Sequence, residues 1–172
     1  PWLESLEGVE VVLDPGAVFT DLPAEVRARA LAAATVWTGN AAEAEALAGS
    51  ADLESAPALV AAHLRPDAVV VVRDGDSGCS VRVGGADILV PGFPQTPVDT
   101  NGAGDTHTGV LCARATRPAA PSRDPGEWAD AARYANAAAA IKVTRRGPTT
   151  VPTATEVEEF LAASADTGHR HG

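Results

Sequence analysis

The run Val69-Val70-Val71-Val72 is the most apolar stretch of the chain, and it decides the fold class. A continuous β-branched run, without alternating polar residues, is typical of a strand that helices cover on both faces. The preceding residues predict a helix over 55–64, which leads through Pro66 into the run. The sequence therefore predicts a buried strand that follows a helix.

The same alternation of strand and helix extends towards the N-terminus. Short apolar runs predict strands at 9–13 and 35–38, and two further segments predict helices at 23–34 and 40–47. Strands that alternate with helices at this spacing indicate right-handed βαβ units and a mostly parallel sheet. The predicted class is α/β.

The pattern changes after the valine run. Short strands at 79–83 and 88–90 flank Gly84-Gly85 and predict an antiparallel hairpin appended to the sheet. A Pro-rich loop follows, and then three helices are expected, at about 104–116, 127–143 and 154–163. Residues 1–165 are expected to form the folded part, and residues 166–172 a disordered tail.

Charge and cysteine content narrow the functional classes. The chain has 13 Lys and Arg against 23 Asp and Glu, a formal charge of −10, so no nucleic-acid partner is expected. No apolar run approaches the roughly 18 residues of a membrane span, so no membrane partner is expected. Two cysteines, Cys79 and Cys112, are too few for a disulfide scaffold, and both are expected to be reduced core residues of a cytoplasmic protein.

The segment 98–109, Val-Asp-Thr-Asn-Gly-Ala-Gly-Asp-Thr-His-Thr-Gly, carries the chemistry. Small residues at the mouth of a helix let the backbone approach a ligand closely, and the N–H groups of the first turn have no intrahelical partners. The helix dipole adds partial positive charge at the same place. This turn is therefore expected to bind an anion such as phosphate.

Asp105, in the first turn of that helix, has two interpretations. A carboxylate beside a phosphate is repelled unless it accepts a proton from an attacking hydroxyl or faces a metal, which is the arrangement of a phosphotransferase base. Alternatively, Asp105 is an ordinary acid of a helix N-terminus, and the glycines only make a turn. The chain has no Gly-x-x-x-x-Gly-Lys-Ser/Thr motif, and Gly102 and Gly104 are not followed by a third glycine at Rossmann spacing, which disfavours dinucleotide binding.

The octapeptide Asp-Thr-Asn-Gly-Ala-Gly-Asp-Thr at 99–106 closely resembles the C-terminal signature of the ribokinase-like carbohydrate kinases, the PfkB family. Five further segments resemble motifs of that family in the same order: Asp14-Pro15-Gly16, Asn40-Ala41-Ala42-Glu43, 72–78, 136–147 and Val151-Pro152-Thr153. The resemblance runs from about residue 9 to 163. It implies a Rossmann-like three-layer sandwich, of which this chain is a partial domain.

Members of this family are longer, and the resemblance implies that the chain is their C-terminal, nucleotide-binding half. The N-terminal part of such kinases supplies the first strands, most sugar contacts and a β-stranded lid. This chain is therefore expected to need an N-terminal half. An unpaired sheet edge near 9–13 would also favour association, for example as a homodimer.

The resemblance gives the signature residues their roles. Asp105 would be the catalytic base, and the backbone N–H groups of Gly102, Ala103 and Gly104 would form an anion hole for the phosphoryl group transferred from ATP. Asn40 and Glu43 would act through water on Mg²⁺ and the ATP phosphates. An Asn followed three residues later by a Glu also forms a helix capping box, and the two roles can coexist.

The other residues assigned by resemblance surround the nucleotide. Gly75 and Gly78 would let the nucleotide lie against the backbone, Asn136 would sit near the adenine, and Arg73 stands where a smaller or hydroxylated residue is common. A monovalent cation, K⁺, is expected beside the anion hole on Asp99 and on the backbone carbonyls of Asn101, Lys142, Arg145 and Gly147; alternatively, Asp99 only caps a turn. The side chains of Lys142, Arg145 and Arg146 are expected on the solvated surface, with a phosphate-facing position as the alternative.

Together, the residues and the resemblance predict an ATP-dependent kinase that transfers the γ-phosphoryl group to a hydroxyl of a sugar or nucleoside. The alternative is a catalytically silent nucleotide-binding module, because a half-chain keeps the residues that bind ATP and lacks most of those that contact the sugar. A third interpretation is a Rossmann-like oxidoreductase. Binding of ATP with Mg²⁺ favours the first two, and binding of NAD the third.

Overall fold

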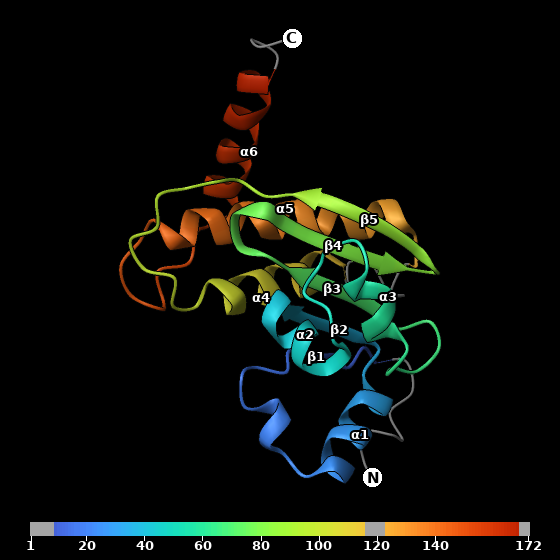
Figure 1. Cartoon of the computed structure of the whole chain (residues 1–172). Helices are drawn as coiled ribbons and strands as arrows, with labels where there is room; N and C mark the ends of the chain where they lie inside the picture. The colour runs from blue at the N-terminus through green and yellow to red at the C-terminus, as the bar shows by residue number, and fades with distance from the viewer. Residues whose placement is uncertain (1–8, 116–122, 169–172) are drawn as a thin grey trace.

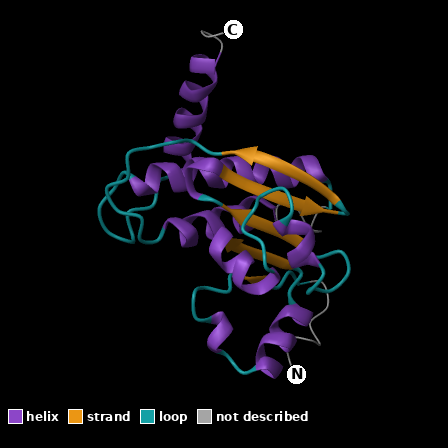
Figure 2. Ribbon diagram, in the orientation of Figure 1, coloured by secondary structure: helices purple, strands orange, loops and turns teal. Residues whose placement is uncertain are grey.

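Strand β3 (Val69–Arg73), predicted from the valine run, is the middle strand of a five-stranded sheet (Figure 1). The computed structural model describes residues 9–115 and 123–168. The strands lie in chain order, and the other four are β1 (Val12–Leu13), β2 (Val36–Asn40), β4 (Gly78–Val83) and β5 (Ala86–Pro91). The sheet forms the middle layer between two layers of helices (Figure 2).

The sheet is mixed rather than mostly parallel. β1, β2 and β3 pair in parallel, whereas β3, β4 and β5 pair antiparallel. The reason is the short connection after β3: it contains only the 3-10 turn η3 (Gly75–Ser77), which leaves no room for the crossover that a parallel neighbour needs. The antiparallel hairpin predicted around Gly84-Gly85 is confirmed.

Two groups of helices cover the two faces of the sheet (Figure 1). One group is α1 (Ala24–Ala33), α2 (Ala41–Ala48) and α3 (Ala56–Ala61), and a 3-10 turn, η2 (Phe19–Asp21), precedes it. The other group is α4 (Ala103–Ala115) and α5 (Pro125–Val143), and α6 (Ala154–Gly168) packs on α5. The three-layer α/β architecture predicted from the sequence is confirmed.

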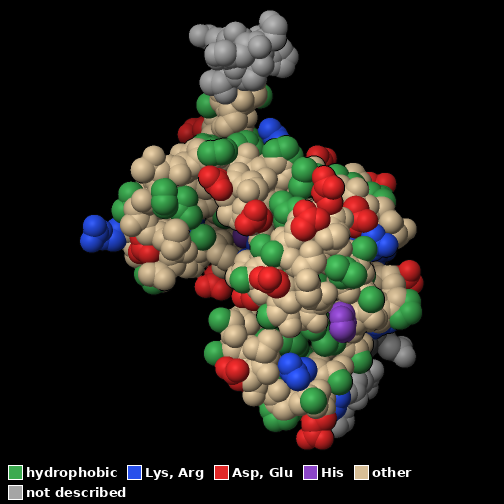
Figure 3. Space-filling view, in the orientation of Figure 1, with side chains coloured by type: hydrophobic (Ala, Val, Ile, Leu, Met, Phe, Trp, Pro, Cys, Tyr) green, Lys and Arg blue, Asp and Glu red, His purple; other side chains and the backbone are tan. Residues whose placement is uncertain are grey.

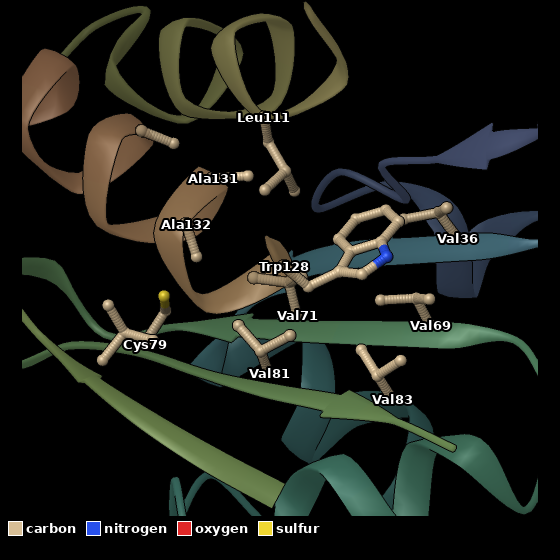
Figure 4. Close-up of a cluster of buried hydrophobic side chains, with 12 residues drawn as sticks. Val36, Val69, Val71, Cys79, Val81, Val83, Leu111, Trp128, Ala131 and Ala132 are labelled. Carbon is tan, nitrogen blue, oxygen red and sulfur yellow. The ribbon is translucent and has the colours of Figure 1, made fainter. Parts of the chain in front are cut away.

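Both faces of β3 are buried, as its unbroken apolar run predicts. Val69 and Val71 belong to one core cluster, which includes Trp128 of α5 (Figure 4). Val70 and Val72 belong to the other cluster, beneath α1, α2 and α3. All four valines are fully buried, so the strand is held in place from both sides.

The core position predicted for both cysteines is confirmed for Cys79 and not for Cys112. Cys79 is buried in the core, and its burial raises the pKa of the thiol to about 12. Cys112 is half-buried, and the two cysteines form no disulfide. In the described part of the chain, no helix combines the length and apolarity that a bilayer-spanning segment needs.

Two predicted boundaries were wrong. The strand expected at 9–13 is only Val12–Leu13, because the N–H of Val11 donates to the Thr35 hydroxyl at 2.8 Å instead of to a backbone carbonyl. The helix expected at 154–163 continues as α6 to Gly168. The sequence contains neither Pro nor Gly between Ala154 and Gly168 to end the helix earlier. Residues 169–172 lie outside the described residues.

We expect Gly78→Ala to destabilise the fold by about 2–4 kcal/mol. Gly78 has φ +99°, and a Cβ there would overlap the carbonyl oxygen of Val90 and the amide nitrogen of Gly92, which are backbone atoms of the neighbouring strand segment. Gly84→Asn is the matched control: its φ is +57°, the space around it is open, and asparagine tolerates this conformation, so the cost should stay below about 1 kcal/mol. Denaturant unfolding measures both, and equal losses in the two variants would contradict this account.

Candidate functional site

A cavity of about 620 Å³ lies where β1, β2 and β3 end and where α2 and α4 begin. Ligands of open α/β sheets bind at the carboxyl ends of parallel strands, so this is the expected place for a site. Most of the residues predicted from the sequence line it: Asn40, Glu43, Arg73, Gly75, Gly78, Ala103, Gly104, Asp105 and Asn136. They come from segments that are far apart in the chain.

The N-terminus of α4 forms one wall of the cavity. Gly102, just before the helix, has φ +78°, and a Cβ there would lie 2.7 Å from the carbonyl oxygen of Pro148, so only glycine fits. The N–H of Ala103 donates to the carbonyl of Thr100 at 3.2 Å. This bond closes the turn that precedes α4. The anion hole predicted on the N–H groups of Gly102, Ala103 and Gly104 stays a prediction.

Asp105 projects from the first turn of α4 into this cavity. It lines the cavity and is exposed, so a substrate can reach its carboxylate. It lies next to Gly104 in sequence, beside the N–H groups and the positive end of the helix dipole. This arrangement supports either role considered above, a base or a helix N-terminal acid.

The guanidinium of Arg73, at the end of β3, binds two other segments of the site. Its Nη2 forms an ion pair with Oδ2 of Asp14 at 3.1 Å, and its Nη1 donates to the carbonyl of Gly104 at 2.9 Å. The hydroxyl of Thr108 donates to the same Asp14 oxygen at 2.7 Å. These bonds join the segment after β1, the end of β3 and the first turns of α4.

Arg73 shares the cavity lining with four carboxylates, those of Asp14, Glu43, Asp76 and Asp105. Among the described residues that line the cavity, Arg73 is the only Lys or Arg. Its Nη2 lies 3.9 Å from Oε2 of Glu43, in addition to the pair with Asp14. Figure 3 shows acidic side chains spread over the face drawn there, in keeping with the net charge of −10. A phosphate entering the cavity would meet this guanidinium and the helix N-terminus as its positive partners.

Asp14 is a site residue that the sequence analysis did not select. Only its turn motif was noted, whereas the structure places its carboxylate in the cavity wall. The available signal was its position: it directly follows β1, as Asn40 ends β2 and Arg73 ends β3. The loop after β5 adds Phe93, Gln95 and Pro97, which no motif marked.

The capping box predicted at the start of α2 is present. Oδ1 of Asn40 accepts the N–H of Glu43 at 2.9 Å, and Oε2 of Glu43 accepts the N–H of Asn40 at 2.8 Å. Both side chains also line the cavity. Within the described ranges, no group of three or more His, Cys, Asp or Glu side chains is arranged to hold a metal. The side-chain oxygens of Asn40 and Glu43 therefore fit only an ion such as Mg²⁺, which keeps several of its waters and binds phosphate oxygens.

Asn136 and His107 form a buried pair at the inner end of the cavity. The amide nitrogen of Asn136 donates to the carbonyls of Val90 and Pro91, so its oxygen faces Nε2 of His107 at 3.0 Å and accepts its proton. Asn136 therefore joins α5 to β5 and α4, and its hydrogen-bonding groups are used within the protein. Burial lowers the pKa of His107 to about 3, the charge of Arg73 acts in the same direction, and the Asn136 bond opposes both.

The residues predicted for K⁺ lie together behind the start of α4 and do not line the cavity. The Asp99 carboxylate accepts the N–H of Gly147 at 2.9 Å and that of Asn101 at 3.0 Å. These two bonds hold the pKa of the Asp99 carboxyl group below its usual value, and the bond from Gly147 is the larger cause. The Lys142 side chain is fully buried, which corrects the prediction of a solvated surface position, and its Nζ lies 3.4 Å from the Asp99 carbonyl oxygen.

Arg145, another residue of the K⁺ prediction, stabilises the start of α6. Its guanidinium pairs with Glu156 and donates to the carbonyl of Val151 at 3.4 Å. Glu156 also accepts the N–H of Thr153 at 2.7 Å, and these bonds lower its pKa to about 2, with the Thr153 backbone bond the main cause. Arg145 is thus a structural residue of the loop between α5 and α6.

The fold and the cavity define an α/β protein with a candidate ligand site at the carboxyl ends of its parallel strands. The sequence profile of the pfkB family carbohydrate kinases matches residues 9–155. The chain belongs to this family.

Individual relatives agree with this assignment. The chain is 35% identical over 131 residues to a ribokinase of Bacillus subtilis, covering 75% of this chain and 40% of that protein. It is 35% identical over 160 residues to an ATP-dependent ribose-1-phosphate kinase of Halopiger xanaduensis, covering 92% and 48%. The chain thus spans about half the length of the relatives it matches.

Solved structures give the same result. A ribokinase of Thermotoga maritima superposes with a TM-score of 0.73 at 26% identity, covering 93% of this chain and 51% of that one. A fructokinase of Vibrio cholerae, bound to fructose, ADP and calcium ion, superposes with a TM-score of 0.74 at 27% identity, covering 88% and 50%. The ribokinase-like fold predicted from the sequence is confirmed.

We expect the free energy of unfolding to decrease as the pH is lowered below about 6.5, in part because of His107. His107 stays neutral in the folded protein down to about pH 3, whereas the unfolded chain binds its proton near pH 6.5, so acid favours unfolding. Between about pH 7 and about pH 5, His107→Gln should reduce the slope of the unfolding free energy against pH by up to roughly 1.4 kcal/mol per pH unit. Denaturant unfolding at several pH values measures it.

His63→Gln is the control for this experiment, because His63 is an exposed histidine of the segment after α3. This substitution should leave the pH slope of the wild type unchanged. A His107→Gln slope equal to that of the wild type would show that His107 does not contribute to acid unfolding.

Proposed function

We propose that the chain carries the ATP-binding and catalytic part of a kinase that phosphorylates a hydroxyl of a sugar or nucleoside. The observation that carries this proposal is the exposed carboxylate of Asp105 in the first turn of α4, in a cavity that also holds a guanidinium. Membership of the pfkB family and relatives named ribokinase, fructokinase and ribose-1-phosphate kinase support it.

In the proposed reaction, Asp105 accepts the proton of the attacking hydroxyl. The hydroxyl oxygen forms a bond to the γ-phosphorus of ATP as the bond from that phosphorus to the bridging oxygen of ADP breaks. The N–H groups of Gly102, Ala103 and Gly104 and the dipole of α4 stabilise the charge on the transferred phosphoryl group. Because little covalent chemistry falls to the protein, positioning and electrostatic stabilisation provide most of the rate increase.

The Arg73 guanidinium has a supporting role in this proposal. Its bond to the Gly104 carbonyl, at 2.9 Å, orients the first turn of α4, and its charge offsets the carboxylates of Asp14 and Glu43 near the phosphates. Glu43 and Asn40 would hold Mg²⁺ through water, and the ion would offset charge on the ATP phosphates when bound.

The rest of the cavity is proposed to bind the nucleotide. The turn containing Gly75 and Gly78 lets the nucleotide approach the backbone, as the sequence predicted. Asn136 is proposed to lie near the adenine, and because its amide is engaged with His107 and two carbonyls, it would act by shaping the cavity. A β-stranded lid and most of the acceptor contacts are expected from a segment outside this chain, either an N-terminal half or a second copy in a homodimer.

We expect Asp105→Asn, in the complete enzyme, to lower kcat by roughly 10²- to 10⁴-fold, which is the usual contribution of a positioned base. Asparagine keeps the size of the side chain but accepts no proton from the hydroxyl. ATP affinity should be kept or should increase, because a negative charge beside the phosphates is removed. Steady-state kinetics and ATP titration measure the two effects separately.

Asp130→Asn is the matched control, since it makes the same chemical change at an exposed position of α5. It should leave both kcat and ATP affinity unchanged. If Asp105 were only a helix N-terminal acid, Asp105→Asn would cost at most about 1 kcal/mol of stability with normal turnover. That outcome would remove Asp105 from the mechanism.

A further inference from the structure

Lys142 is a buried cation outside the cavity, in the last turn of α5. Burying an ammonium group is unfavourable unless polar groups replace its water, and Lys142 Nζ lies 3.4 Å from the carbonyl oxygen of Asp99. The carbonyl end of a helix also carries partial negative charge, which favours a cation there.

The residues predicted to bind K⁺ do not fit a further cation beside this ammonium. Both Asp99 carboxylate oxygens already accept backbone N–H groups, from Asn101 and Gly147. Two of the predicted carbonyl ligands are also engaged: that of Lys142 accepts the N–H of Arg145 at 3.0 Å, and that of Gly147 accepts the Thr150 hydroxyl at 2.8 Å. A unit positive charge already stands at the Asp99 carbonyl.

We propose that the ammonium group of Lys142 takes the place of the monovalent cation expected beside Asp99, so that this protein does not depend on K⁺. The inference concerns the same site as the proposed kinase function, but it rests on the contacts of Lys142 and Asp99. It makes Lys142 a positioning residue, because no contact with the cavity is involved.

The ammonium group of Lys142 affects the anion hole indirectly, through the contacts of Asp99. Asp99 binds Gly147, and the carbonyl of the next residue, Pro148, lies directly against Gly102. The N–H of Gly102 is one of the proposed anion donors. A cation at Asp99 therefore orders the loop between α5 and α6 against the start of α4, and Lys142 supplies that cation from within the chain.

Thermal unfolding without nucleotide tests this proposal. The midpoint is compared in K⁺, NH₄⁺ and tetramethylammonium salts at equal ionic strength, for the wild type, Lys142→Ala and Lys142→Met. The wild-type midpoint should be the same in all three salts. Lys142→Ala should melt lower in tetramethylammonium and recover by several degrees in K⁺ or NH₄⁺, because a small cation can enter the space and stabilises the state it binds.

Lys142→Met separates charge from volume. Methionine fills the space with an uncharged side chain, so its lowered midpoint should not recover in K⁺ or NH₄⁺. Arg146→Met is the control, since it removes the same charge from an exposed position of the neighbouring loop, and it should show no salt-specific change. If Lys142 acted only through the packing of its aliphatic stem, no cation would restore the unfolding midpoint of Lys142→Ala.

Two results would overturn the proposal. One is a wild-type midpoint that is higher in K⁺ than in tetramethylammonium, and the other is equal behaviour of Lys142→Ala in the three salts. If Lys142→Ala unfolds, its refolding yield replaces the midpoint: a higher yield in K⁺ supports the proposal, and equal yields contradict it. None of these readouts involves turnover, so they are independent of whether the kinase assignment holds.

Discussion

The guanidinium of Arg73 joins three segments on which the site depends. Its bonds to Asp14 and to the Gly104 carbonyl connect the end of β1, the end of β3 and the first turn of α4. The side chain is only 11% exposed, so these bonds are poorly screened by solvent. If the Asp14–Arg73–Gly104 connection were lost, the start of α4 and the carboxylate of Asp105 would no longer be held against the sheet.

Three positively charged groups lie in or near the proposed phosphate site. The N-terminus of α4 contributes a partial charge, Arg73 is the cationic residue of the described cavity lining, and Lys142 is buried behind the Gly102 turn. The side chains of Arg73 and Lys142 each donate to a backbone carbonyl. The described cavity lining also carries four carboxylates, those of Asp14, Glu43, Asp76 and Asp105, so Arg73 and the helix N-terminus are the groups that would favour an anion there.

Local patterns predicted most of the fold, and the long-range contacts escaped them. The valine run, the Asn40 capping box and the Gly84-Gly85 hairpin each depend on neighbouring residues, and all three are present. The partners of Arg73 and Lys142 are distant in sequence and could not be derived from spacing; the interpretation of Lys142 as a surface residue was wrong for this reason. For the same reason Asp14 was not selected, although its position at the end of a strand was available as a signal.

The central claim is that the N-terminus of α4 and the turn after β3 bind a nucleoside triphosphate. Amide chemical shifts followed during titration with ATP and Mg²⁺ test it most directly, with NAD as the comparison. The account predicts the largest changes at Gly102 and Gly104 and at the turn containing Gly75 and Gly78, with no matching response to NAD. Changes confined to other parts of the chain, or an equal response to NAD at these glycines, would contradict it.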